Sequence, residues 1–224
     1  VAYETQFLRS FDCVTASTSK IRRDVDHEKL PVGIEVETFT PQSASLFTDS
    51  RPIVGYSGRM AQKKNVDEIL RVAAETPDYR YVLVGEGPAR PELQQQAPDN
   101  VEFRDFLPRE QLPTFYSSLD VFVTASTCDT LGLSTLEANA CGTPVAAANV
   151  QPFRETIGPD NGARFAYGDL DEMAAAIADC LTTDRQTRAA VERFAVDRTI
   201  DDLEAIYRGE PAAVEDRQRV SPSV

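Results

Sequence analysis

Short apolar runs alternate with helix-patterned segments along most of the chain, from about residue 52 to residue 181. The apolar runs are bounded by Gly, Pro and Asp, as strands usually are. Repeated alternation of strand and helix is typical of βα units around a parallel sheet. The pattern predicts an α/β fold with a Rossmann-like parallel sheet of about six strands flanked by helices, the strands lying at 53–58, 80–85, 100–103, 120–126, 143–148 and 162–166.

Helices are predicted where apolar positions recur every three or four residues. In segment 65–75, Val66, Ile69 and Ala73 fall on one face of a helix. Proline at position 88 is placed to open another helix. The helices predicted in this way lie at 65–75, 88–93, 111–117, 133–140, 170–182 and 196–207.

The pattern also divides the chain. Residues 31–208 hold the alternating elements and form the predicted main domain, entered through a linker-like segment with prolines near both ends, 30–41. Residues 1–30 resemble one further βα unit, the closing fragment of a preceding domain. Residues 209–224 have no periodicity and few large apolar side chains, which predicts a disordered tail.

The net charge of −13 changes the range of expected partners. Such a chain is repelled at long range by nucleic acid and by anionic membrane surfaces, so neither is expected as the main partner. Only four of the 23 basic residues are lysines. Many acids with few lysines suit a protein soluble in high salt, where self-repulsion is screened, and we hypothesise a halophilic source.

Other classes are excluded on simple grounds. The longest apolar run, 173–178, is far shorter than the ~20 residues of a membrane-spanning helix. The first residues lack the features of a secretory signal, so a cytoplasmic protein is expected. Four scattered cysteines and one histidine, His27, do not form a zinc-binding pattern, so no metal site is expected.

Ligands of open parallel sheets bind beyond the carboxyl ends of the strands, which directs attention to the loops that follow them. After the first strand, GRMAQKKN places Arg59 and Lys64 near the start of a helix. Two cations beside helical amides favour a diphosphate site, and a solvated basic loop is an equally plausible interpretation. After the second strand, GEGP holds two glycines that allow close approach of a ligand or form a tight turn.

The most informative stretch is TASTCDTLGLSTLEANACGTPVAAA, after the fourth strand. Asp129 and Glu137 lie eight residues apart, and Gly132 between them opens a helix. Carboxylates at such places can accept hydrogen bonds from sugar hydroxyls. Two alternatives remain open, a capping-box role for Glu137 with Ser134 and an ordinary loop position for Asp129.

Taken together, GRMAQKKN, VLVGEGP and the stretch DVFVTASTCDTLGLSTLEANACGTPVAAA resemble the landmarks of glycosyltransferase family 4, the retaining two-domain GT-B enzymes. Their order and spacing agree with the family, and the similarity covers about residues 31–208. The resemblance implies that this segment is the nucleotide-sugar-binding domain and that residues 1–30 close the acceptor domain. It implies a UDP- or GDP-sugar donor and a glycan or lipid acceptor, with no metal or other cofactor.

The resemblance also implies roles for individual residues. Arg59 and Lys64 would hold the diphosphate, which would approach the chain at Gly58. Glu137 would hold the ribose and Asp129 the transferred sugar. Further substrate contacts are implied at Gly132, Leu133 and Ser134, toward phosphate or sugar oxygens, and at Arg104, Asp105 and Phe106, toward the base.

The sequence departs from the family pattern at several positions. Asp129 stands where Glu is usual, Lys63 where Glu is usual, Asp105 where Gly is usual and Asn139 where Met is usual. The shorter acid at 129 leaves the transferred sugar open.

Three other functions stay open. These are a non-catalytic nucleotide-sugar-binding or assembly module, a nicotinamide-dependent enzyme, which lacks its Gly-x-Gly-x-x-Gly loop here, and a GT-B epimerase. The last helix, 196–207, has Ile200, Leu203 and Ile206 on one face. This apolar face is interpreted as core packing. The alternative is that a missing domain leaves the face exposed and the face then promotes dimerisation. A lipid acceptor would place the protein at the cytoplasmic face of the membrane.

Overall fold

The computed structural model describes residues 13–17, 27–209 and 219–220. The chain divides into two compact units, which are described separately. One comprises Val36–Glu192, and the other combines Val1–Glu35 with Arg193–Val224. The larger unit carries every predicted site residue.

The larger unit is built on a parallel sheet of six strands, as the apolar pattern predicts. All neighbouring strands run in the same direction, in the order β5-β4-β3-β6-β7-β8. The strands are β3 (Ile53–Ser57), β4 (Arg80–Val84), β5 (Val101–Arg104), β6 (Val121–Thr124), β7 (Val145–Ala148) and β8 (Gly162–Phe165). The strand order reverses between β3 and β6, which is the topological switch point where ligands of such sheets bind.

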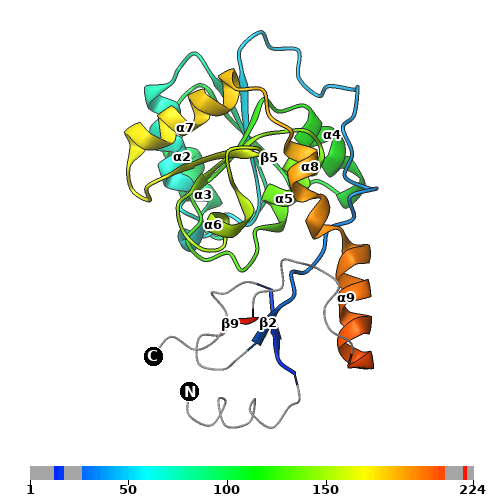
Figure 1. Cartoon of the computed structure of the whole chain (residues 1–224). Helices are drawn as coiled ribbons and strands as arrows, with labels where there is room; N and C mark the ends of the chain where they lie inside the picture. Colours follow the sequence, from blue (N-terminus) through cyan, green and yellow to red (C-terminus); the bar gives the residue numbers. More distant parts are fainter. Residues whose placement is uncertain (1–12, 18–26, 210–218, 221–224) are drawn as a thin grey trace, which may run out of the picture. The chain divides into compact units, whose positions relative to one another are not determined.

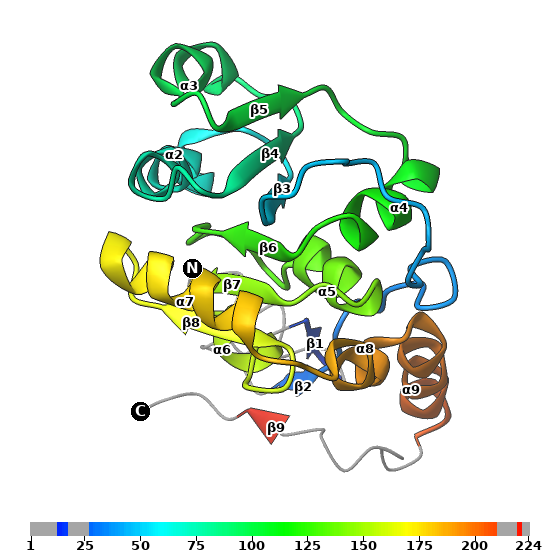
Figure 2. The ribbon, with the colours of Figure 1, turned by 90° about the horizontal axis from the view of Figure 1, so that it is seen from above.

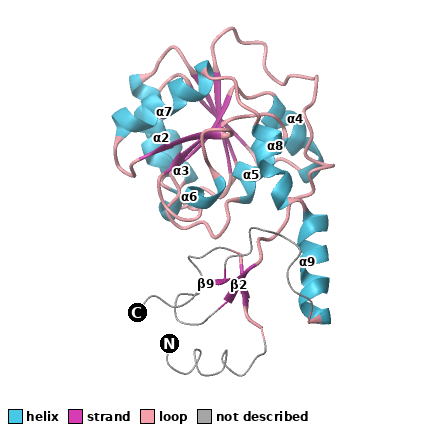
Figure 3. Cartoon of the chain, in the orientation of Figure 1, coloured by secondary structure: helices cyan, strands magenta, loops and turns pink. Residues whose placement is uncertain are grey.

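Helices cover both faces of this sheet (Figures 1, 2 and 3). One face carries α2 (Val66–Glu75), α3 (Arg90–Gln96) and α7 (Leu170–Thr182), and the other carries α4 (Leu112–Ser117), α5 (Leu133–Ala140) and α8 (Thr187–Val191). A short helix, α6, spans Phe153–Thr156. The 3₁₀ turns are η1 (Gln62–Lys64), η2 (Arg109–Gln111) and η3 (Glu192–Phe194).

The apolar faces of the predicted helices are buried against the sheet. Ile69 and Ala73 of α2 and Met173 of α7 are fully buried in one cluster with the inward side chains of β3, β4 and β6. The four β6 residues and the four β7 residues are all buried, as expected for central strands covered on both faces. Removing this apolar surface from water is the main favourable contribution to folding.

Segment 36–52, which leads into β3, has no regular secondary structure among its residues but is anchored to the larger unit. Phe39 is fully buried against Tyr116, and the guanidinium groups of Arg80 and Arg104 both lie over the Phe47 ring. Arg188 of α8 donates hydrogen bonds to the Phe39, Ala140 and Val36 carbonyls. The helices α6 and α8 are too short for periodicity to predict them, and both are absent from the sequence prediction.

The smaller unit contains β1 (Thr15–Ala16), β2 (His27–Lys29), β9 (Arg219–Val220) and α9 (Val196–Arg208). β2 pairs parallel with β1 and antiparallel with β9. The helix predicted to follow β1 lies outside the described residues, as does most of the predicted tail. Apolar Ile200, Leu203 and Tyr207 on α9 are exposed, so core packing is the wrong interpretation of Ile200 and Leu203. Dimerisation through this face stays a prediction.

Candidate functional site

A cavity of about 310 Å³ lies at the carboxyl ends of β3 and β6, where the strand order reverses. The structure brings together there predicted residues from the loops after β3 and β6 and from helix α5. Those lining the cavity are Gly58, Lys64, Asp129, Gly132, Leu133, Ser134 and Glu137. Residues up to 79 positions apart in the chain, Gly58 to Glu137, therefore share one site.

An adjoining cavity of about 220 Å³ shares Ser57, Gly58 and Leu112 with the first. Arg59 and Phe106 line this second cavity. Arg59 lines the second cavity and not the first, whereas Lys64 lines the first and not the second. Gly58 lines both cavities.

Arg104 and Asp105 line neither cavity. The Arg104 guanidinium donates to Glu102 Oε1 at 2.6 Å and stacks on the Phe47 ring at 4.9 Å. Asp105 forms an ion pair of 2.7 Å with Arg90 of α3. The side chains of Arg104 and Asp105 thus hold the loop after β5 in place. Of the three predicted residues 104–106, only the exposed Phe106 lines the second cavity.

The loop glycines allow the backbone of two loops to pack closely. Gly85 has φ +135°, and a Cβ atom there would lie 2.0 Å from the Gly58 carbonyl oxygen. The Met60 amide donates to the Glu86 carbonyl at 2.8 Å. The GEGP glycines therefore allow the loops after β3 and β4 to pack closely. Gly85 also lines the second cavity, so approach of a ligand stays a prediction.

Helix α5 begins at the cavity. Gly132 precedes it with φ +80°, and a Cβ atom at Gly132 would lie 2.6 Å from the Phe153 ring, so only glycine fits. The first amides of a helix have no acceptor within the helix, and those of Leu133 and Ser134 open α5 at the cavity. Such amides and the positive end of the helix dipole favour an anion.

The capping-box interpretation of Glu137 is wrong. The residue that caps α5 is Gly132, no side chain caps the helix, and the Ser134 and Glu137 positions both lie inside it. Glu137 is instead a buried carboxylate whose Oε2 accepts a hydrogen bond of 3.0 Å from the Tyr116 hydroxyl. Arg109 Nη1 lies 3.9 Å from its other oxygen, Oε1.

Asp129 is more than an ordinary loop acid. Its Oδ1 accepts a hydrogen bond of 2.6 Å from Lys64 Nζ, and both side chains are about one-quarter exposed. The pair joins the loop after β3 to the loop after β6. The basic loop is therefore partly buried at Lys64, whereas Arg59 is exposed to solvent.

The first cavity is also lined by residues that the sequence pattern does not predict, among them Tyr56, Ser57, Tyr116 and Thr124. Burial raises the pKa of Tyr56 and Tyr116 well above 10, so both hydroxyls keep their protons. Tyr56 donates to the Arg59 carbonyl at 3.1 Å and so holds the turn that carries this cation. No local pattern distinguishes these tyrosines from core residues, because their ring faces are buried.

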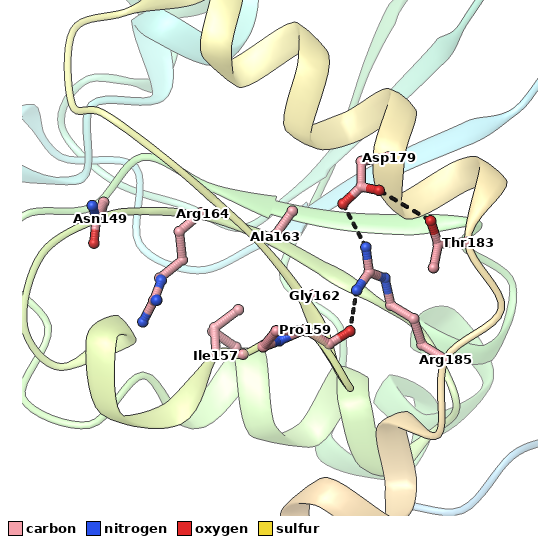
Figure 4. A pocket seen from close by; sticks show the side chains of 10 residues that line it. Asn149, Ile157, Pro159, Gly162, Ala163, Arg164, Asp179, Thr183 and Arg185 are labelled. Carbon is pink, nitrogen blue, oxygen red and sulfur yellow. Dashed lines mark hydrogen bonds and ion pairs between the residues drawn. The ribbon is translucent and has the colours of Figure 1, made fainter.

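A separate cavity of about 510 Å³ lies beside the edge strand β8 (Figure 4). Arg185 donates there to the Pro159 carbonyl and, at 2.5 Å, to Asp179 Oδ2, while Thr183 donates to Asp179 Oδ1 at 3.0 Å. None of the predicted site residues lines it. Asp179 and Arg185 are paired with each other, and Arg164 donates to the Arg154 carbonyl at 2.9 Å. This cavity is not the predicted site.

The fold is that of GT-B glycosyltransferases. Sucrose-phosphate synthase from Thermosynechococcus elongatus superposes with a TM-score of 0.80 at 24% identity, over 92% of this chain and 60% of that one. HepE of Anabaena, solved in complex with UDP and glucose, gives a TM-score of 0.80 at 20% identity, over 93% of this chain and 66% of that one. At these identities the likeness shows the fold alone.

The sequence settles the family. Residues 39–196 match the family described as Glycosyl transferases group 1, and the chain belongs to that family. It is 32% identical over 216 residues to the D-inositol 3-phosphate glycosyltransferase of Mycolicibacterium smegmatis, covering 85% of this chain and 48% of that protein. It is 29% identical over 177 residues to a GDP-mannose-dependent monoacylated alpha-(1-6)-phosphatidylinositol monomannoside mannosyltransferase of Corynebacterium glutamicum, covering 69% of this chain and 46% of that protein. The chain thus spans about half the length of these relatives.

Proposed function

We propose that this chain is the donor-binding half of a retaining glycosyltransferase that moves a sugar from a nucleoside-diphosphate sugar to an acceptor. The observation that carries the proposal is the convergence of Lys64, Asp129, Glu137 and the first amides of α5 on one cavity at the switch point of the sheet. Cation, amides and carboxylates match the diphosphate and hydroxyl groups of such a donor.

The diphosphate would lie across Gly58, between Lys64 in the first cavity and Arg59 in the second. As the glycosyl–phosphate bond breaks, negative charge grows on the departing nucleotide. Two preorganised cations and the positive end of α5 would stabilise that charge without a divalent metal. Lys64 contributes both to binding and to the transition state in this arrangement.

The carboxylates would hold hydroxyl groups. Glu137 would accept hydrogen bonds from the ribose, and Asp129 from the transferred sugar, once the donor phosphate has taken over Lys64. The base would lie in the second cavity beside Phe106, whose exposed ring offers a stacking surface. The base would be uracil or guanine, since a structure with the same fold holds UDP and one relative is GDP-mannose-dependent.

The acceptor would be a glycan or a lipid, bound by a domain beyond the larger unit. A lipid acceptor would bring the protein to the cytoplasmic face of the membrane. Within the described residues, no helix has the length and apolar character to span a bilayer.

Isothermal titration with UDP, GDP and UMP tests the donor site. The chain should bind one of the two diphosphates, and UMP should bind about tenfold or more weakly than UDP if UDP is that ligand, because it lacks the phosphate that bridges toward Lys64. Absence of heat with both diphosphates would refute the proposal. An assay of donor hydrolysis then distinguishes an active enzyme from the alternative, a nucleotide-sugar-binding module. A chain that spans about half the length of its relatives is also compatible with such a module.

A further inference from the structure

Tyr116 of α4 lines the first cavity next to Glu137. Its ring is 1% exposed and lies among three other aromatic rings, with centroids 5.7 Å from Phe115 and Phe122 and 6.2 Å from Phe39. Aromatic packing of this kind restricts the orientation of the ring. The position of the Tyr116 hydroxyl is therefore set by the core rather than by solvent.

That hydroxyl lies against helix α5 of the site. It donates to Glu137 Oε2 at 3.0 Å. Burial raises the pKa of the Tyr116 hydroxyl, and the side chain of Ser57, the last residue of β3, acts to lower it. Arg109, whose guanidinium lies 5.1 Å from the Phe39 ring centroid, approaches Glu137 Oε1 from outside at 3.9 Å. The carboxylate is thus held before any ligand arrives.

We propose that Tyr116 is a positioning residue that orders the Glu137 carboxylate for the ribose hydroxyls of the donor. The inference rests on the proposed function, in which Glu137 holds the ribose. A glutamate side chain with free torsions loses rotamer entropy when it binds a ligand, and a side chain already ordered by the protein does not. Tyr116 supplies that order through one hydrogen bond to a charged group.

The alternative is that Tyr116 only fills the core. Burial is common to both roles, but dependence on the ribose hydroxyls is not. A core residue affects folding and every ligand alike. A residue that acts through Glu137 affects only ligands that carry the hydroxyl groups Glu137 binds.

The test is isothermal titration of the full chain and of Tyr116→Phe, which keeps the ring and deletes the hydroxyl. The probes are the nucleoside diphosphate that the parent chain binds and its 2′,3′-dideoxy form. Tyr116→Phe should weaken the ribonucleotide about tenfold, the range of one hydrogen bond to a charged group, and leave the dideoxynucleotide unchanged. In a Glu137→Ala background the same change should have no further effect.

Tyr81→Phe is the matched control. Tyr81 is also fully buried, and its hydroxyl is 2.8 Å from Thr76 Oγ1, outside both cavities. Removing it deletes a comparable buried hydroxyl and should leave both affinities at the parent values. Thermal melts of the three proteins show whether the fold is kept.

Equal losses for the ribonucleotide and the dideoxynucleotide would overturn the inference, as would a ribonucleotide affinity equal to the parent value. If Tyr116→Phe does not fold, Ser57→Ala removes the other side chain that acts on the pKa of this hydroxyl and must show the same ribose-dependent loss for the inference to stand. A parent chain that binds neither UDP nor GDP overturns the proposed function and this inference with it.

Discussion

Lys64 Nζ donates a hydrogen bond of 2.6 Å to Asp129 Oδ1, across the switch point of the sheet. The two residues come from the loops after β3 and β6, and they are the ones proposed to hold the diphosphate and the sugar. In the unliganded chain the Lys64 ammonium group and the Asp129 carboxylate are therefore paired with each other. Binding of a donor would replace this ion pair with two sets of ligand contacts.

Asp129→Asn removes the acid that competes for Lys64. UDP should then bind about two- to fivefold more tightly, because a partly exposed ion pair contributes about 0.5–1 kcal/mol that the diphosphate no longer has to replace. A UDP-sugar should gain less over UDP than in the parent chain, because the carboxylate for the sugar hydroxyls is lost. Titration of both ligands measures the two effects, and weaker binding of UDP would contradict the competition.

Lys64→Ala in the complete enzyme should lower the turnover number, with a loss of transition-state stabilisation on the order of 2–4 kcal/mol, the range for one preorganised oxyanion contact. Steady-state kinetics with saturating donor report this loss. Lys63→Ala is the control, because Lys63 is the exposed neighbour on the same 3₁₀ turn and lines neither cavity. Normal turnover of Lys64→Ala would refute the role of this cation.

Asn139→Ala should destabilise the larger unit by about 2–3 kcal/mol. Asn139 is fully buried, its amide donates to the Thr143 and Asn161 carbonyls at 3.0 and 2.8 Å, and its Oδ1 accepts from the Asn161 amide at 3.0 Å. The variant leaves these groups without partners. Urea unfolding measures the change, and Asn149→Ala, at an exposed position, should stay within about 0.5 kcal/mol.

Glu68→Gln should raise stability near neutral pH. Burial raises the pKa of Glu68 above 4.5, and its Oε2 is buried without a partner. A carboxyl with a raised folded pKa contributes its full stability below the unfolded pKa and loses it as the pH rises through the folded pKa. Thermal melts should show the variant above the parent at neutral pH, with the difference shrinking below pH 4.5. A difference independent of pH would exclude this cause.

The acidic composition predicts a stability that rises with salt. The net charge of −13 means that acidic side chains repel one another at low ionic strength. The screening length falls to about 3 Å at 1 M salt, which weakens this repulsion. Urea unfolding from low to molar KCl should therefore give an increasing free energy of unfolding. A flat curve would count against a halophilic origin.

Much of the fold could be predicted from the local pattern of apolar and polar residues. The strands and most helices fall within a few residues of their predicted bounds, because a buried strand or an amphipathic helix of about ten residues repeats its pattern often enough to be recognised. The pattern does not predict the helices α6 and α8, because four or five residues make about one turn. It places Phe39 in a linker, since nothing local shows that its ring is buried against Tyr116.

The sequence by itself determined which loops line the candidate site, because the carboxyl ends of parallel strands must lie at one edge of their sheet. Only the tertiary structure decided the partner of each side chain: Lys64 with Asp129, Tyr116 with Glu137, and Asp105 with Arg90 away from both cavities. Strand order and helix packing bring these groups together from positions up to 65 residues apart. Hydrogen bonds act over about 3 Å, so a pairing of this kind exists only after the sheet has assembled.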